Sequence, residues 1–466
     1  MGMSEGTRET DASADAQGET RRSACPGLFR IVPARDGGIC RVKLPLGQLS
    51  VAKARAVAAS ASRFGSGIIE ATSRANLQIR GIRAGDEAEL TRSLVDAGLG
   101  PSRPDADDVR NVMVSPTAGI DPLQQIDARP IARELLAMID AGAVGRSLSA
   151  KFCILVDGGE SVAAVDRPHD IWLASLAGGA KMAIGFAGAP PIAADDVTPF
   201  ITVPAQHAVA AVTASLALFA EEPAGDPAVT RFRHLLARIS RAGFIERLAE
   251  RLSGAVERRA EVRGWRRRRP APLDHVGVGA QRQGGLVFVG AVPPFGRLSP
   301  DLLARLAEIA EEVGDGGLRL TPWQSVILPS IPREIASRAV TALEAAGLTC
   351  DPSHPLASIV ACAGMAGCSR AKSDTKADAL ALAWAVGAGA PRVIHLSGCS
   401  RSCACAGVAD ATLLASAPGR YELFVKADAQ SSRFGRPVAG DLTVRQAAEM
   451  LREMRAARST AGGDER

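Results

Sequence analysis

The stretch ICRVKLPLGQLSVAKARAVAASASRFGSGIIEATSRANLQIRGI, residues 39–82, has a second copy further along the chain. Residues 284–331 read GGLVFVGAVPPFGRLSPDLLARLAEIAEEVGDGGLRLTPWQSVILPSI. Each copy is typical of a strand, a helix capped by Ser or Ser-Pro, a glycine stop and a second strand. Chance similarity in an Ala- and Gly-rich chain is the alternative to a true repeat. The matching residues keep one offset without a gap: Gly47 and Gly296, Ser50 and Ser299, Gly65 and Gly314, Gly67 and Gly316, Thr72 and Thr321.

A βαβ unit with short loops cannot bury its sheet alone, so we expect the two copies to pair into one layered domain. A longer mixed region follows each copy, the first with the strand AKFCILVDGG and the second with the strands RVIHLSG and YELFVKA. The chain is therefore predicted to be α+β. The predicted divisions are a disordered tail 1–23, a half-domain 24–83, a larger domain 84–257, a basic linker 258–272, a half-domain 273–335 and a larger domain 336–466.

The composition limits the possible functions. The chain has 466 residues, 47% hydrophobic and 23% charged, with a net charge of +5, which is typical of a globular protein with a large core. One Tyr and twelve Phe leave little for base stacking, so we expect no nucleic-acid partner. No apolar run is long enough for a membrane span, and the polar N-terminus predicts neither signal peptide nor anchor. We therefore expect a cytoplasmic protein with reduced cysteines.

The basic stretch RRAEVRGWRRRRPAP, residues 258–272, lies between the two halves. It is interpreted either as a solvated linker ending at Pro270 or as a segment that steers an anionic ligand or partner. The following GVGAQRQGG lacks the spacing of a dinucleotide-binding loop and does not follow a strand. Reducing equivalents are therefore expected to come from a separate electron donor.

Four cysteines fall into two spaced pairs. ACAGMAGCS holds Cys362 and Cys368, and HLSGCSRSCACAG holds Cys399 and Cys403. Structural zinc sites usually have shorter gaps between paired cysteines, whereas a wider loop suits a [4Fe–4S] cluster; zinc and unliganded thiols are the alternatives.

Glycines near these cysteines support the cluster. Gly364 and Gly367 let the backbone close around sulfide, and Gly398 stands between a strand and an expected helix, whose amides favour an anionic cluster. The remaining cysteines are interpreted as small buried side chains.

With these cysteines in the second half of a duplicated chain, the sequence resembles the sirohaem nitrite/sulfite reductase family. ATSRANLQIRGI is similar to its T-x-R-x-x-x-Q signature through Arg74 and Gln78, VRNVMVSP to its R-N-V segment through Arg110, and LSAKFCIL to its lysine-bearing strand through Lys151. The resemblance implies two ferredoxin-like half-domains that pair into one domain, plus two larger α/β domains that form the cluster and tetrapyrrole site. It also implies that Cys403 bridges cluster and sirohaem.

The chain departs from the reductase pattern at Cys153, where the reductases present a second polar ligand for the anion. A thiol cannot supply that charge or amide donor. This departure, with HLSGCSRSCA and DPLQQIDARPIA, resembles the precorrin-3B synthases of the same superfamily. That resemblance implies a dioxygen-dependent monooxygenase of aerobic cobalamin biosynthesis, which hydroxylates C20 of precorrin-3A and forms a γ-lactone from the ring A acetate. It also implies a mononuclear non-haem iron beside the cluster.

The expected substrate-binding residues follow from the same resemblance. Precorrin-3A and sirohaem are both fringed with carboxylates, which arginine forks bind well. Arg74, Arg80, Arg110 and Lys151 are expected to hold or surround such a ligand; the alternative for each is a surface ion pair.

Some assignments stay open. The six histidines give no convincing iron site, because His169 and Asp170 are neighbours on a strand and His395 is better interpreted as a hydrogen-bonded core residue. Two other functions compete with the synthase: a sirohaem-dependent assimilatory nitrite or sulfite reductase, and a non-catalytic iron–sulfur or tetrapyrrole-binding module.

Overall fold

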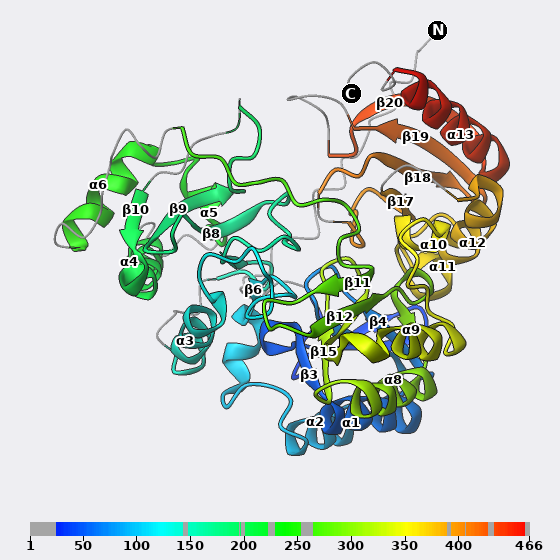
Figure 1. The fold of residues 1–466 in the computed structure, drawn as a ribbon, viewed down its shortest axis with the longest axis horizontal. Coiled ribbons are helices and arrows are strands. Elements are labelled where there is room, and N and C mark those ends of the chain that lie inside the picture. The colour runs from blue at the N-terminus through cyan, green and yellow to red at the C-terminus, as the bar shows by residue number, and fades with distance from the viewer. Residues whose placement is uncertain are drawn as a thin grey trace, which may run out of the picture.

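The computed structural model describes residues 25–461 except 143–147, 195, 197–200, 222–228, 253–263, 389–392, 406 and 427–432. The predicted disordered tail 1–23 lies outside these residues. Three lobes are visible in Figure 1: a central lobe with helices α1 and α8, a second lobe with strands β6–β10, and a third with strands β16–β20. No helix of the described chain is both long and apolar enough to cross a membrane.

Two five-stranded sheets build the central lobe, and each takes one strand from the other copy of the repeat. The first has the order β1-β2-β5-β4-β13 and the second β11-β12-β15-β14-β3. In the exchanged pairs Arg297 lies opposite Glu70, and Arg319 lies opposite Gln48. The strands of the first copy are β1 Val32–Ala34, β2 Gly37–Val42, β3 Gln48–Ser50, β4 Ile68–Ala71 and β5 Leu77–Ile82. Those of the second are β11 Gly277–Ala280, β12 Leu286–Ala291, β13 Arg297–Leu298, β14 Gly317–Leu320 and β15 Val326–Pro332.

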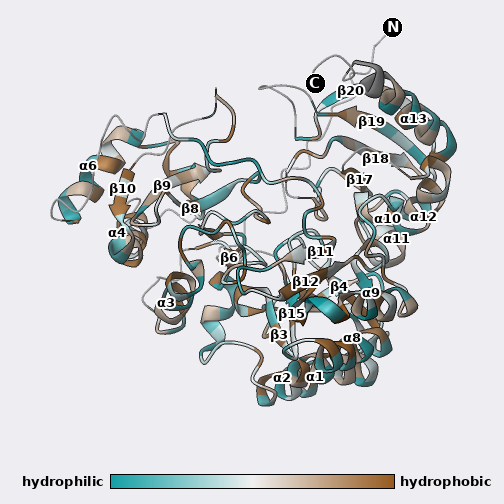
Figure 2. Cartoon of the chain, in the orientation of Figure 1, coloured by the Kyte–Doolittle hydropathy of each residue, from teal (hydrophilic) through white to brown (hydrophobic). Residues whose placement is uncertain are grey.

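Helices α1 (Val51–Phe64) and α8 (Pro300–Val313) cover these sheets and pack on each other. Ser50 and Ser299 cap them, each accepting a hydrogen bond from the backbone three residues on, as the repeat predicted. Their apolar sides share one core that draws buried residues from both copies. Figure 2 shows hydrophobic residues on the strands of this lobe and along both helices. The expected pairing of the copies into one domain is confirmed.

The backbone repeats as closely as the sequence. Left-handed conformations occur at equivalent positions 249 residues apart (295 − 46), although only some of these positions are glycine in both copies. Gly47 and Gly296 adopt φ of 69° and 72°. A Cβ at Gly47 would lie under 3.0 Å from the backbone of the opposite copy, and a Cβ at Gly296 would lie under 3.0 Å from a side chain of its own copy. The other equivalent pairs are Leu46 and Phe295, Gly67 and Gly316, Ala75 and Gln324, Gly81 and Ser330, and Gly98 and Gly347.

The two outer lobes are also copies of one design. Each sheet has three neighbouring parallel strands followed by two antiparallel ones. The first sheet contains β6 Val112–Val114, β7 Ile154–Asp157, β8 His169–Ser175, β9 Lys181–Gly188 and β10 Ile201–Pro204, with α3 Ala128–Asp140, α4 Ala208–Glu221 and α6 Arg241–Arg251. The second contains β16 Ile359–Ala361, β17 Ile394–Ser397, β18 Ala411–Ala417, β19 Arg420–Val425 and β20 Arg436–Thr443, with α12 Thr375–Val386 and α13 Val444–Ala461.

The central lobe extends beyond the divisions expected from the sequence. Helix α2 (Glu87–Asp96) packs on α1, and α9 (Ala336–Ala345) packs on α8. Leu90 and Leu343 are fully buried in the shared core. The amphipathic pattern of these helices does not identify the sheet that they cover, so both helices were expected in the larger outer domains.

The basic linker is anchored where it leaves the second lobe. Arg267 is 4% exposed, and its guanidinium donates to both carboxylate oxygens of Asp157, at 2.6 and 2.9 Å. It also donates to the carbonyl of Glu160 at 2.5 Å. Burial and the charge of Asp157 raise the pKa of Glu160 well above its usual range. This part of the linker is therefore not a solvated spacer.

Because each central sheet takes a strand from the other copy, we predict that neither half of the chain folds alone. Residues 24–257 and residues 258–466, expressed separately, should aggregate, since each would expose half of the shared core. Co-expressed, they should copurify through a tag on one half and elute as one species of full size. A monodisperse half with its own cooperative thermal transition would contradict the shared core.

Candidate metal centre and tetrapyrrole site

The four paired cysteines follow two neighbouring parallel strands. Cys362 and Cys368 come after β16, and Cys399 and Cys403 come after β17. The carboxyl ends of parallel strands meet at one edge of a sheet, so the two loops lie together. The amide of Gly398 donates to Cys362 Sγ at 3.2 Å.

Cys403 lies within electrostatic reach of the other three cysteines. Partial desolvation, followed by the charges of the other three cysteines, raises the pKa of Cys403. Thiolates that repel one another in this way are stabilised by bound metal.

The loop geometry leaves room only for glycine at two positions. A Cβ at Gly398 would lie 2.7 Å from the Ala371 side chain, and Gly364 adopts φ +67° with its hydrogen facing the amide of Thr375. The expected helix after Gly398 is wrong: residues 399–405 form turns and bends. The turns place Cys403 within electrostatic reach of Cys362.

The arrangement fits a cluster better than a single ion. Within the described ranges, no three His, Cys, Asp or Glu side chains are close enough together to hold one metal ion. In a zinc site the thiolates stand roughly 4 Å apart, as Zn–S bonds of about 2.3 Å require. A [4Fe–4S] cubane is larger than a single ion and accepts four thiolates that stand further apart.

The other cysteines are buried or partly buried elsewhere. Burial raises the pKa of Cys350 to about 12, so this thiol stays protonated. Cys405 donates to the carbonyl of Gly407 at 3.3 Å.

A small hollow, with a volume of about 10 Å³, is lined by apolar and amide residues from several segments together with two arginines. Arg74 and Arg110 both contribute to its wall. Arg74 donates to the carbonyls of Ala150 and Lys151, at 3.4 and 3.1 Å, which brings the turn that carries Lys151, just before β7, to the same wall. The Lys151 side chain is exposed.

Arg110 carries an unused buried donor in this wall. Its Nε lies 3.1 Å from Asp140 Oδ1, but its buried Nη1 has no hydrogen-bond partner among the described residues. Buried guanidinium nitrogens normally have acceptors. A ligand carboxylate is a suitable acceptor for this nitrogen.

Two further basic residues, which were not expected from the sequence, lie within electrostatic reach of Arg74. Arg41 and Lys43 alternate on strand β2 and its end, so they face the same side. Arg41 lies within electrostatic reach of Arg74 and Cys403. Gln78, with its amide oxygen turned toward Arg41, accepts two hydrogen bonds from that guanidinium at 2.7 and 3.2 Å. Two cations spaced by two in an apolar strand were the signal that could have revealed them.

Lys43 has an unusual ionisation. Its Nζ donates to the carbonyl of Asp107, and the side chain is buried. Burial lowers the pKa of Lys43 to about 8, although the Asp107 carboxylate opposes the shift. Lys43 can therefore lose or gain its charge near neutral pH.

Arg80, the fourth expected substrate ligand, faces the cysteine loop instead of the hollow. It donates to Asp36 and to the carbonyl of Gly367, and it lies 3.5 Å from Glu70. Of the four expected residues, the structure therefore brings Arg74, Arg110 and Lys151 to one wall and separates Arg80 from them.

Cys153 is a buried neutral thiol. It is 4% exposed, and burial raises its pKa to about 11 despite the charge of Arg74. Its amide donates to Asp170 Oδ2, a carboxylate that also accepts from Arg231. Asp170 is thus occupied by structural contacts.

The histidines singled out in the sequence are buried and neutral. Burial lowers the pKa of His169 to about 3 and that of His395 to about 4. Within the described chain, His169 Nδ1 and His395 Nε2 have no hydrogen-bond partner. The expected core position of His395 is confirmed by its burial, and the unsatisfied nitrogen is Nε2 alone.

Comparison with protein families assigns most of the described lobes. The nitrite/sulfite reductase ferredoxin-like half domain matches residues 32–97 and 279–346, which are the two copies of the repeat. The nitrite and sulphite reductase 4Fe-4S domain matches residues 105–255, the lobe that is the structural counterpart of the cysteine-bearing lobe.

Several curated proteins and one solved structure are similar. The chloroplastic ferredoxin–nitrite reductase of Arabidopsis thaliana is 31% identical over 79% of this chain and 66% of its own length. The ferredoxin–nitrite reductase of Leptolyngbya laminosa is 30% identical over 83% and 78%. A precorrin-3B synthase from Sinorhizobium sp is 28% identical over 87% and 83%.

The structure of the Mycobacterium tuberculosis NirA protein matches with a TM-score of 0.71 and 21% identity, over 92% of this chain and 82% of that one. The fold, the matched families and these relatives agree, and the named relatives are oxidoreductases. The chain belongs to the nitrite/sulfite reductase family, whose α+β fold pairs two ferredoxin-like half-domains.

Proposed function

We propose that this protein is a precorrin-3B synthase, a monooxygenase that hydroxylates C20 of precorrin-3A and forms a γ-lactone from the ring A acetate. One oxygen atom of dioxygen enters the product, and two electrons and two protons reduce the other to water. The relative from Sinorhizobium sp supports this proposal, because the similarity extends over 83% of that protein's length.

The observation that carries the proposal is the neutral thiol of Cys153. A reductase of small oxyanions needs charged or amide donors close to the bound anion. Cys153, two residues after Lys151, is buried and has a pKa near 11, so it supplies neither charge nor a strong donor. The position is therefore suited to packing and not to anion reduction.

The basic wall would bind the carboxylates of the substrate. Arg74 and Arg110 present guanidinium groups from separate segments, and Arg110 has a donor free for an acceptor. Arg41 would be neutralised by the same ligand. Arginine forks bind carboxylates through paired hydrogen bonds and hold the macrocycle in one orientation.

Cys362, Cys368, Cys399 and Cys403 would hold the [4Fe–4S] cluster, which when bound transfers single electrons from an external donor. The names of two relatives identify ferredoxin as the donor to those enzymes, and a separate small electron carrier is proposed here too. The family resemblance also implies a mononuclear iron, but the described residues gather no ligand set for it. We assign no residue to that iron.

A sirohaem-dependent nitrite or sulfite reductase is the second candidate. It is favoured by the plant and cyanobacterial relatives, which are as similar to the chain as the synthase is. In this alternative the same basic wall would hold the carboxylates of sirohaem as a resident cofactor.

Substrate conversion and absorption spectra separate these functions. Cluster-loaded protein given precorrin-3A, an electron donor and ¹⁸O-labelled dioxygen should release a product that carries one labelled oxygen, detected by mass spectrometry. The purified protein should show broad thiolate-to-iron absorption without intense Soret bands. Soret bands together with nitrite or sulfite reduction would establish the reductase, and well-loaded protein without any turnover would favour a binding module.

Replacement of Cys153 tests the role of the thiol. Under the synthase function, Cys153→Lys and Cys153→Asn should not create appreciable nitrite or sulfite reduction, because the required redox macrocycle is missing. Reduced methyl viologen as electron donor and the loss of each anion would measure this. Cys350→Ala, which alters a buried thiol of the central lobe, is the matched control. Robust reduction by either Cys153 variant contradicts the synthase.

The pKa of Lys43 predicts a pH dependence of ligand binding. The side chain is cationic below its pKa of about 8, so affinity for a polycarboxylate should fall as pH rises through 8. A stable carboxylate-bearing porphyrin can serve as the probe, with binding followed by fluorescence. The fall should approach tenfold per pH unit for one coupled proton, and Lys43→Met should flatten it. Lys53→Met, on helix α1, should keep the wild-type profile, and an unchanged profile for Lys43→Met would exclude this lysine from the site.

A further inference from the structure

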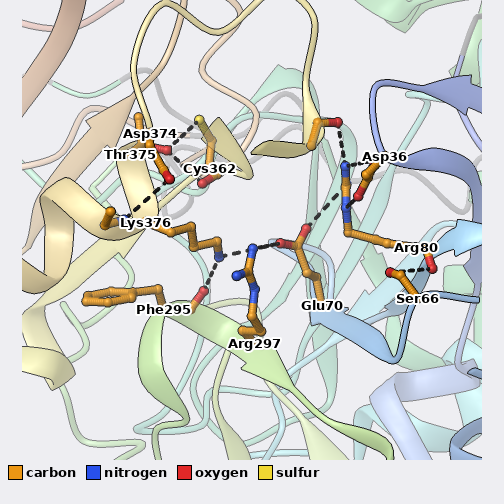
Figure 3. Close-up of polar contacts among 12 residues, drawn as sticks. Asp36, Ser66, Glu70, Arg80, Phe295, Arg297, Cys362, Asp374, Thr375 and Lys376 are labelled. Carbon is orange, nitrogen blue, oxygen red and sulfur yellow. Dashed lines mark hydrogen bonds and ion pairs between the residues drawn. The ribbon is translucent and has the colours of Figure 1, made fainter. Parts of the chain in front are cut away.

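A buried carboxylate stands where three segments of the chain meet. Glu70 lies on β4 and is 8% exposed. Its oxygens lie 3.5 Å from Arg80 Nη1, 3.7 Å from Lys376 Nζ and 3.6 Å from Arg297 Nη2. These cations come from β5, from helix α12 of the cysteine-bearing lobe and from the exchanged strand β13 (Figure 3).

Arg80 connects this carboxylate to the backbone beside Cys368. Its Nε and Nη2 donate to the two oxygens of Asp36, at 2.9 and 3.0 Å. The same Nη2 donates to the carbonyl of Gly367 at 2.6 Å. A Cβ at Gly367 would lie 2.4 Å from this nitrogen, so the loop approaches the guanidinium as closely as only glycine allows.

Lys376 connects the same carboxylate to the segment beside Cys362. Its Nζ donates to the carbonyl of Phe295 at 2.6 Å, which fixes the start of α12 on the central lobe. The preceding residue, Thr375, donates to the carbonyl of Cys362 at 2.8 Å, and its hydroxyl lies 3.4 Å from Cys362 Sγ (Figure 3). Both ends of the first cysteine loop are thus tied to cations that share one carboxylate.

The group carries more positive than negative charge. Three cations, Arg80, Arg297 and Lys376, surround the two carboxylates Asp36 and Glu70, which leaves one positive charge in a group whose centre, Glu70, Arg80 and Lys376, is buried. Burial alone would raise the pKa of Glu70, but the charges of Lys376, Arg80 and Arg297 lower it, so the carboxylate is ionised. Arg80 is within electrostatic reach of Cys368, and Lys376 of Cys362. Buried charges interact strongly because little solvent screens them.

We propose that Glu70, Arg80 and Lys376 are positioning residues that hold the loop 362–368 in place for the cluster and stabilise the electron added to it. This inference rests on the proposed cluster, and it assigns Arg80 to the cluster and not to the substrate. Hydrogen bonds and charges around a metal centre set its reduction potential and fix the ligands that hold it.

The other copy of the repeat provides an internal comparison. Residue 319 is the counterpart of residue 70 at the offset of 249, and Arg319 stands there. It is buried and donates to the carbonyls of Pro116 and Ala118, at 2.9 and 3.0 Å, in the loop after β6. That loop contains no cysteine. Both copies hold the equivalent loop from the central sheet, but only the cysteine-bearing copy does so with a carboxylate and two cations.

Reduction potentials and cluster content test the proposal. In protein reconstituted anaerobically with iron and sulfide, Lys376→Met should keep the cluster but weaken stabilisation of its reduced form about tenfold, which is about 59 mV toward negative potential for one electron. Arg80→Met should lose cluster content several-fold. Arg80→Lys, which keeps the charge but loses the fork, should recover the potential of the remaining cluster more fully than its content. Arg319→Met is the matched control and should change neither, although it also removes a buried guanidinium.

A second measurement needs no cluster. In the cluster-free protein, Arg80→Met and Gly367→Ala should both raise the rate at which a thiol reagent alkylates Cys368, followed by mass spectrometry, while Arg319→Met should leave that rate unchanged. Wild-type potentials and alkylation rates in all of the Arg80 and Lys376 variants would overturn the network while leaving the cluster intact. A wild-type protein that takes up no cluster would instead refute the proposed cluster, and with it the proposed effect on potential.

Discussion

The exchange of one strand between the two copies is the constraint on which the rest of the structure depends. Strand β13 completes the first sheet and β3 completes the second, so neither copy is a finished unit. The exchanged pairs bring residues 70 and 319 to equivalent places, Glu70 toward the cysteine-bearing lobe and Arg319 toward the other outer lobe. The interaction that closes the central core therefore also orients both lobes that form the site.

The two outer lobes stabilise the equivalent loop, after β6 and after β16, in different ways. Counting from the equivalent strands β6 and β16 places Ser115 and Asp121 where the other copy has Cys362 and Cys368. Asp121 accepts from the Thr117 hydroxyl and from the amide and hydroxyl of Ser161, at 2.7–2.9 Å. Protein hydrogen bonds satisfy this loop, whereas four thiolates that repel one another need metal for the same stability. The cysteine-bearing lobe can hold a cluster, and the equivalent loop of the other outer lobe is stabilised by protein hydrogen bonds instead.

Features confined to a short stretch were predictable from the sequence, and those made by distant contacts were not. The repeat left a constant offset, matching caps and matching left-handed residues, so the fold followed from it. Arg80 gave no such signal, because an arginine within an apolar strand has the same appearance whether it meets a substrate or the carbonyl of Gly367, 287 residues away. Lys43 was not identified because it stands at the end of an apolar strand. The turns after Gly398 were not predicted because they depend on contacts between two cysteine loops that are distant in the sequence.

The charges of the basic wall bear on the choice between a small anion and a macrocycle. Burial and the charge of Arg74 both lower the pKa of Arg41, and burial lowers that of Lys43, so each of these cations is costly to keep charged. A small oxyanion touches one point and could relieve little of this cost. A macrocycle fringed with carboxylates reaches several cations at once and offsets the repulsion among them. With Cys153 neutral beside the wall, the electrostatics are matched to the large ligand, whether it is bound as substrate or as sirohaem.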